Sequence, residues 1–224
     1  MLSGPERMVQ YAGRMVSIVH LVRHGEVDNP DQVVYADLAG FGLSGGGRRQ
    51  ATWASTRLAA HPIGAVYASP LDRARETAQV IALPHGLEPL VLPEVTEWAL
   101  MSRWAGLPWA DLDIHFPGEL GAYLRDPVAL DFAPESVTEL ALRVGRAVDD
   151  LADRHPGQEV VVVSHQDPIQ AARLQLTGQH LGRLHKDKPR HCEVISLARS
   201  ERWRQASRVA PTEAGRTTRT TTDF

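Results

Sequence analysis

The stretch SIVHLVRHGE, residues 17–26, joins an apolar run to a group of charged side chains. The run SIVHLV has the length of a buried strand, and Arg23 and His24 follow where that strand would end. Two later apolar runs are also followed by polar residues. The run GAVYAS (64–69) leads into SPLDRARETA (69–78). The run EVVVVS (159–164) leads into SHQD (164–167). Three apolar strands that end in polar residues predict a sheet with a ligand site at its carboxyl edge.

Helical patterns separate these runs and predict the fold class. One begins after Ser44, a suitable N-cap residue, and the others cover 72–82, 135–154 and 169–178. CEVISLAR (192–199) is predicted as a last strand. Strands that alternate with helices predict a three-layer α/β/α sandwich with a mostly parallel central sheet.

The length of 224 residues suits one domain that carries an insertion. We expect the domain over 16–200, after a flexible N-terminal arm at 1–15. The threonine-rich end predicts a disordered tail at 210–224, because it has too few apolar residues to bury. The stretch 92–134 interrupts the alternation and is expected to form an insertion over the site, in which three tryptophans either line the site or pin the insertion to the sheet: Trp98, Trp104 and Trp109.

Composition excludes several classes of function. The net charge of -3 provides no basic excess for nucleic acid or anionic lipid. Neither an apolar run of membrane-spanning length nor a signal-peptide run occurs, so a cytoplasmic location is expected. The single cysteine, Cys192, cannot form an intramolecular disulfide or a thiolate metal cluster, and the histidines lack the spacing of HExxH. We therefore expect the protein to use no metal and no cofactor. Its expected partner is a small phosphorylated molecule, and the sequence does not predict the oligomeric state.

The polar residues after the three strands suggest phosphoryl chemistry. Convergence of Arg23, His24, Arg73 and His165 on one crevice would surround a dianion with positive charge. A neutral imidazole can attack phosphorus and form a phosphohistidine when one ring nitrogen is fixed by a hydrogen bond. Gly25 leaves the backbone room for such a bond.

These motifs, RHGE (23–26), SPLDRARETA (69–78) and SHQD (164–167), resemble those of the histidine phosphatase superfamily, which has the phosphoglycerate mutase-like fold. The resemblance covers about residues 17–198, and three motifs in order are a much stronger signal than RHG alone. It implies that His24 becomes phosphorylated beside Arg23. It also implies catalytic roles for Arg73 and His165.

The proton donor implied by the resemblance lies in VTEWALMSRWAG (95–106), where Glu97 matches the family's acidic residue. A carboxyl group with a tuned pKa can protonate the leaving alcohol and then activate water. Met101 and Ala105 replace two residues of the family pattern, so Glu94 is a competing assignment.

Other departures from the family pattern concern the substrate. Gln166, Asp167 and Pro168 replace the small residues usual after the second histidine, and Asn29 lies one position earlier than the family's asparagine. We expect four residues to bind substrate: Arg23, Arg73, Asn29 and Gln166. His20 is expected to be a buried, hydrogen-bonded histidine. The basic run RLHKDKPRH (183–191) is expected to be a solvated loop, with contact to a substrate tail as the alternative.

The predicted function is that of a metal-independent phosphatase, which hydrolyses a phosphomonoester through a phosphohistidine on His24. The alternatives are phosphoryl transfer of the phosphoglycerate mutase type and a non-catalytic module that binds phosphorylated ligands. The short insertion and its altered acidic motif favour hydrolysis over the mutase. The intact arginine and histidine pairs argue against the binding module.

Overall fold

A computed structural model describes residues 10–11, 14–15 and 17–212 of the chain. The predicted flexible arm at 1–15 and disordered tail at 210–224 lie mostly outside these residues. Of the arm, β1 (Gln10–Tyr11) and β2 (Arg14–Met15) are described and pair antiparallel.

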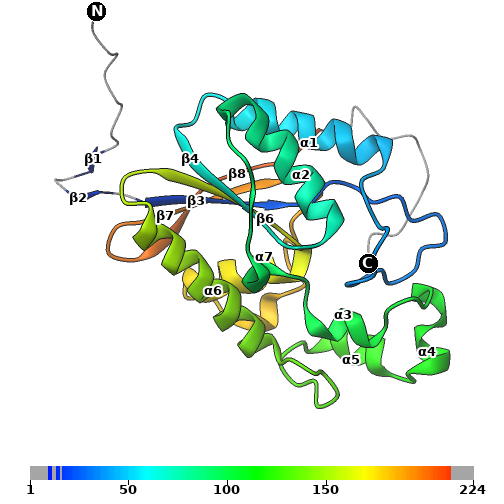
Figure 1. Cartoon of the computed structure of the whole chain (residues 1–224). Coiled ribbons are helices and arrows are strands. Elements are labelled where there is room, and N and C mark those ends of the chain that lie inside the picture. Colours follow the sequence, from blue (N-terminus) through cyan, green and yellow to red (C-terminus); the bar gives the residue numbers. More distant parts are fainter. Residues whose placement is uncertain (1–9, 12–13, 16, 213–224) are drawn as a thin grey trace, which may run out of the picture.

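The centre of the fold is a six-stranded sheet in the order β5-β4-β6-β3-β7-β8 (Figure 1). Its strands are β3 (Ser17–Arg23), β4 (Ile63–Ala68), β5 (Leu90–Val91), β6 (Glu159–Ser164), β7 (Val194–Arg199) and β8 (Trp203–Val209). The four strands β5, β4, β6 and β3 are parallel, whereas β7 and β8 are antiparallel additions beside β3. The parallel arrangement puts the carboxyl ends of β4, β6 and β3 side by side.

Helices cover both faces of the sheet (Figure 1). On one face lie α1 (Gly45–Leu58) and α2 (Asp72–Ala82), and on the other lie α6 (Val137–Arg154) and α7 (Gln166–Leu176). Successive strand residues point to opposite faces, so Val161 and Val163 pack in the layer of α1 and α2, whereas Val160 and Val162 pack in the layer of α6 and α7. The predicted three-layer α/β/α fold is confirmed.

The insertion consists of short helices. They are η2 (Pro93–Val95), α3 (Ala99–Arg103), η3 (Trp109–Asp111), α4 (Leu112–His115) and α5 (Glu119–Arg125). Outside the insertion lie two further 3-10 turns, η1 (Leu83–His85) and η4 (Leu181–Arg183). Trp98 and Trp104 are completely buried, and their indole N–H groups donate to the Glu135 carbonyl and to a Glu119 carboxylate oxygen. These two tryptophans pin the insertion, whereas Trp109 lines a pocket.

Two elements differ from the sequence prediction. Helix α7 begins at Gln166, three residues before the predicted start at residue 169, and Pro168 lies in its first turn. Proline is tolerated there because the first helical N–H groups have no partner within the helix. Strand β8 was not predicted and lies beyond the expected domain end at residue 200. Its side chains are mostly exposed and polar, so it lacks the apolar run that marked the other strands.

Within the described residues, no helix is long and apolar enough to cross a bilayer.

Candidate active site

The site lies at the carboxyl edge of the three neighbouring parallel strands. Arg23 ends β3 and His24 follows it, His165 follows β6, and Arg73 lies in the first turn of α2 after β4. The backbone N–H of His24 donates to the Ser164 carbonyl over 3.0 Å, which ties the two histidine-bearing strand ends together. The ring centroids of His24 and His165 are 5.2 Å apart. The structure thus brings together the four residues predicted to bind and attack a phosphoryl group.

His24 is held in one tautomer. Its Nδ1–H donates to the Gly25 carbonyl over 2.8 Å, which leaves the lone pair on Nε2. Burial, reinforced by the positive charge of Arg73, holds the pKa of His24 well below its usual value. The imidazole is therefore neutral at physiological pH, the form that can act as a nucleophile.

Gly25 is required by a close approach of the His24 loop to α1. A Cβ on Gly25 would lie 2.6 Å from the carbonyl oxygen of Gly47, a contact too short for any side chain. The Gly25 N–H donates to the Thr77 hydroxyl, which in turn donates to the Arg73 carbonyl. Helices α1 and α2 therefore both fix the carbonyl that orients His24.

Three buried nitrogen atoms of the site have no hydrogen-bond partner among the described residues: Nε of Arg23, Nε of Arg73 and Nδ1 of His165. One other nitrogen of each side chain makes hydrogen bonds that hold it in place. Arg23 Nη1 contacts the Gln166 amide oxygen and the Pro189 carbonyl, and Arg73 Nη2 contacts the Ala36 carbonyl. His165 Nε2 lies 2.7 Å from the Ser69 hydroxyl. Buried polar atoms are rarely left unpaired, and three of them on cationic or imidazole groups suit an anionic ligand.

Glu97 lies beside this group of nitrogens. Its Oε2 is 3.8 Å from His165 Nδ1 and 4.0 Å from Arg73 Nη2, and its Oε1 accepts the Trp98 N–H. Burial raises the pKa of Glu97 to about 7, against the opposing effect of Arg73. The competing candidate, Glu94, is exposed in η2 and does not line the pocket. The geometry favours Glu97 as the group that exchanges a proton.

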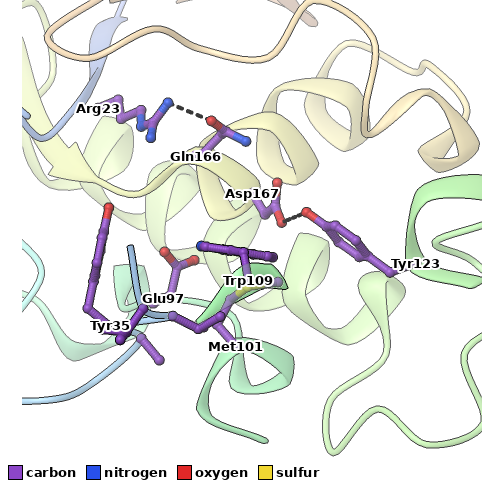
Figure 2. A pocket seen from close by; sticks show the side chains of 11 residues that line it. Arg23, Tyr35, Glu97, Met101, Trp109, Tyr123, Gln166 and Asp167 are labelled. Carbon is purple, nitrogen blue, oxygen red and sulfur yellow. Dashed lines mark hydrogen bonds between the residues drawn. The ribbon is translucent and has the colours of Figure 1, made fainter. Parts of the chain in front are cut away.

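A pocket of about 120 Å³ opens next to these residues (Figure 2). Eleven residues line it: Arg23, Val33, Val34, Tyr35, Ala36, Glu97, Met101, Trp109, Tyr123, Gln166 and Asp167. The Tyr35 ring covers the Arg73 guanidinium at 4.6 Å, and His24 is only 1% exposed. Gln166, predicted to bind substrate, does line the pocket.

Asp167 and Tyr123 form the far side of the pocket (Figure 2). The Tyr123 hydroxyl donates to Asp167 Oδ2 over 2.7 Å, while Oδ1 has no hydrogen-bond partner among the described residues. Lys188 Nζ lies 3.7 Å from Oδ1 and donates to the Tyr123 oxygen. A buried carboxylate oxygen that accepts no hydrogen bond suits a hydroxyl or ammonium donor of a ligand.

The structure places Asn29 and the run 183–191 differently from what the sequence suggested. Asn29 does not line the pocket; its amide bonds to both the N–H and the carbonyl of Val33 and so shapes a loop. The run 183–191 is more than a solvated loop, because Lys188 Nζ lies 3.7 Å from the pocket residue Asp167 and the His191 ring lies 5.6 Å from that of His24. Its charged composition resembled a solvated surface, and no local pattern indicated that it folds back over β3.

Comparison with known proteins agrees with this geometry. The profile of the histidine phosphatase superfamily (branch 1) matches residues 19–210. This chain belongs to the histidine phosphatase superfamily. The match includes β8 and every site residue described above, and it confirms the family resemblance of the three motifs.

The relatives of this histidine phosphatase include two phosphatases with named activities and one uncharacterised protein. Phosphoserine phosphatase 1 of Hydrogenobacter thermophilus is 29% identical over 170 residues, 75% of this chain and 80% of that protein. The metal-independent phosphoserine phosphatase of Arabidopsis thaliana is 31% identical over 175 residues, 72% of this chain and 69% of that protein. An uncharacterised protein of Mycobacterium tuberculosis is 40% identical over 184 residues, 80% of this chain and 87% of that protein.

Among solved structures, the mycobacterial glucosyl-3-phosphoglycerate phosphatase has a TM-score of 0.75 and 25% identity, covering 85% of this chain and 97% of its own. The fold is therefore the predicted phosphoglycerate mutase-like one. Together with its relatives, the chain is assigned to the phosphatases, enzymes that hydrolyse phosphomonoesters.

Proposed function

We propose that this histidine phosphatase hydrolyses a small phosphomonoester in two steps, through a phosphohistidine on Nε2 of His24 and without a metal ion. The observation that carries the proposal is the set of three unpaired buried nitrogens on Arg23, Arg73 and His165, beside an imidazole whose other nitrogen is fixed by Gly25. The two guanidinium groups can neutralise the transferred phosphoryl group, the task for which many phosphoryl-transfer enzymes use a metal, and the imidazole of His165 can donate a hydrogen bond to it.

In the first step, the lone pair of His24 Nε2 forms a bond to phosphorus while the bond from phosphorus to the ester oxygen breaks. Protonated Glu97 gives its proton to that oxygen, so the alcohol leaves neutral. Arg23, Arg73 and His165 hold the phosphoryl oxygens throughout.

In the second step, ionised Glu97 takes a proton from water, whose oxygen attacks phosphorus as the bond to His24 breaks. Inorganic phosphate is released, and Glu97 is again protonated. A pKa of about 7 suits both directions of transfer at neutral pH.

The substrate class follows from the pocket and the relatives. The relatives include phosphoserine phosphatases and a glucosyl-3-phosphoglycerate phosphatase. A pocket of about 120 Å³ suits a small leaving group. The unpaired oxygen of Asp167 favours an alcohol that carries a hydroxyl or ammonium donor.

The test is hydrolysis of p-nitrophenyl phosphate in the presence of EDTA, with wild type compared to His24→Ala. We expect wild type to turn over and to give an acid-labile, base-stable phosphoenzyme when a labelled ester is quenched within one turnover. His24→Ala should give neither product nor phosphoenzyme.

Full activity in His24→Ala, or loss of wild-type activity that added metal restores, would contradict the proposal. Vanadate separates an enzyme from a non-catalytic binding module, because it imitates the five-coordinate transition state and should inhibit far below the concentration at which phosphate competes. Transfer of the label to an added phosphoglycerate instead of water would favour the mutase.

A further inference from the structure

A row of polar side chains crosses one face of the sheet, away from the active site. Ser207 on β8, Ser196 on β7 and His20 on β3 occupy paired positions in the sheet register, and Glu159 starts the neighbouring strand β6. His61 completes the row from the turn before β4. The row lies in the layer that α1 and α2 cover, where the surrounding strand residues are apolar.

Three of these side chains converge on one point. His20 Nε2 and His61 Nδ1 lie 2.7 and 2.8 Å from the same oxygen of Glu159, Oε2. All three atoms lie within 4.8 Å of one another, and this is the one such group of potential ligands among the described residues. As the sequence predicted, His20 is a buried histidine, 1% exposed.

We propose that His20, His61 and Glu159 form a binding site for a divalent ion of the zinc type. Two imidazole nitrogens and one carboxylate oxygen are a ligand set that Zn²⁺ accepts. Tetrahedral bonds of about 2 Å place ligand atoms about 3.3 Å apart, so His20 and His61 need to retreat from Glu159 by only about half an ångström. The His61 side chain is 43% exposed, which leaves an entry path and room for water as the fourth ligand.

The surroundings of the three residues support this proposal. Metal-bound histidines usually have their second nitrogen held by a hydrogen bond, and Nδ1 of His20 lies 2.9 Å from the Ser196 hydroxyl. Ser207 donates to Ser196 over 2.9 Å and extends the support to the edge strand. Besides this small movement, metal binding needs a change of tautomer, in which the proton of His20 moves to Nδ1 and that of His61 moves to Nε2.

The site is separate from the proposed phosphatase chemistry. His20 precedes His24 by four residues of extended chain, about 13 Å. No local sequence pattern indicates the site, because its two histidines lie 139 and 98 residues before Glu159 in the chain. Bound metal would join β3, β6 and the turn before β4, so its effect would be on stability and not on turnover.

The experiment is a Zn²⁺ titration of metal-free full-length protein in competition with a chromophoric chelator. We expect one Zn²⁺ per chain for wild type, for His24→Ala and for His115→Ala, the last an exposed histidine outside both sites. Ser196→Ala should lower the affinity for Zn²⁺ by roughly 10- to 100-fold. His61→Ala and Glu159→Gln, which each lose a ligand, should lower it by more. Because His61 is half-exposed, its alanine variant should fold, which circular dichroism checks.

A second measurement is the melting temperature, which excess Zn²⁺ should raise in wild type but not in His61→Ala. Wild-type stoichiometry and affinity in His61→Ala, loss of binding in His24→Ala, or no stoichiometric binding by wild type would each overturn the proposal.

Discussion

Burial favours the uncharged forms of both His24 and Glu97. For His24 this lowers the pKa, and for Glu97 it raises the pKa to about 7. The neutral imidazole has the lone pair that attacks phosphorus, and the neutral carboxyl has the proton that the leaving oxygen needs. One physical cause therefore prepares both groups for the first step.

The pKa of Glu97 predicts how the first step depends on pH. The proton donor is lost as pH rises through about 7, so phosphorylation of His24 by an alkyl phosphomonoester should slow progressively above that pH. p-Nitrophenyl phosphate has a good leaving group and should be much less affected. Single-turnover kinetics with both esters measures this difference.

In Glu97→Gln, the alkyl ester should react about 10²- to 10⁴-fold more slowly at neutral pH, without the decline above pH 7. An unchanged decline in that variant would show that another group supplies the proton.

The same shift predicts the stability of Glu97→Gln. The folded-state pKa of Glu97 lies above its ordinary value of 4.5, so its stabilising contribution is complete below pH 4.5 and disappears as pH rises through about 7. Above pH 7, Glu97→Gln should therefore be more stable than wild type, by at most about 3 kcal/mol. Urea unfolding at pH 8 and pH 4.5 measures the free energy of unfolding; equal differences at both values would contradict the shift.

At the scale of elements, the sequence predicted what local patterns determine. Apolar runs located β3, β4 and β6, and their parallel order brought Arg23, His24 and His165 to one edge. The sequence alone left Glu94 as an alternative to Glu97, because the burial of Glu97 depends on tertiary packing around its neighbour Trp98, which is completely buried and donates to the Glu135 carbonyl. Tyr35, Lys188 and His191 were missed for a similar reason: loops place them by tertiary contacts that leave no periodic signal.

The close approach of the His24 loop to α1 yields a prediction for Gly25→Ala. The new Cβ would collide with the Gly47 carbonyl, and the loop would move together with the carbonyl that orients His24. A displacement of about 1 Å in a catalytic group costs on the order of 100-fold in rate. We expect kcat to fall by about that factor, measured with p-nitrophenyl phosphate.

Ser136→Ala provides the control for general loss of stability. Ser136 caps α6 in a reciprocal pair with Glu139, and neither residue is one of the active-site residues. Its loss should cost about 1 kcal/mol of stability and leave kcat unchanged. If both variants lowered kcat equally, the effect of Gly25→Ala could not be assigned to the orientation of His24.

At the scale of the whole molecule, β8 belongs to the domain although its sequence is largely polar. Trp203 packs in the core and donates its indole N–H to Asp149 on α6, while the Arg199 guanidinium lies 5.4 Å from the Trp203 ring. The strand also covers β7, which would otherwise be a long exposed edge.

A chain that ends at Ser200 should therefore be unstable and prone to aggregation, although it keeps every residue of the active site. A chain that ends at Thr212 keeps the whole sheet and should melt close to wild type. Soluble yield and melting temperature distinguish the two. Wild-type stability in the shorter chain would show that the domain ends before β8.

The burial of the one thiol determines how the enzyme should respond to oxidants. Cys192 is completely buried, its N–H donates to the Arg23 carbonyl, and burial raises its pKa far above the usual value. Phosphatases that attack with a thiolate are silenced when peroxide oxidises that sulfur. With an imidazole as the proposed nucleophile and no reactive thiolate beside it, this phosphatase should keep its turnover during oxidative stress.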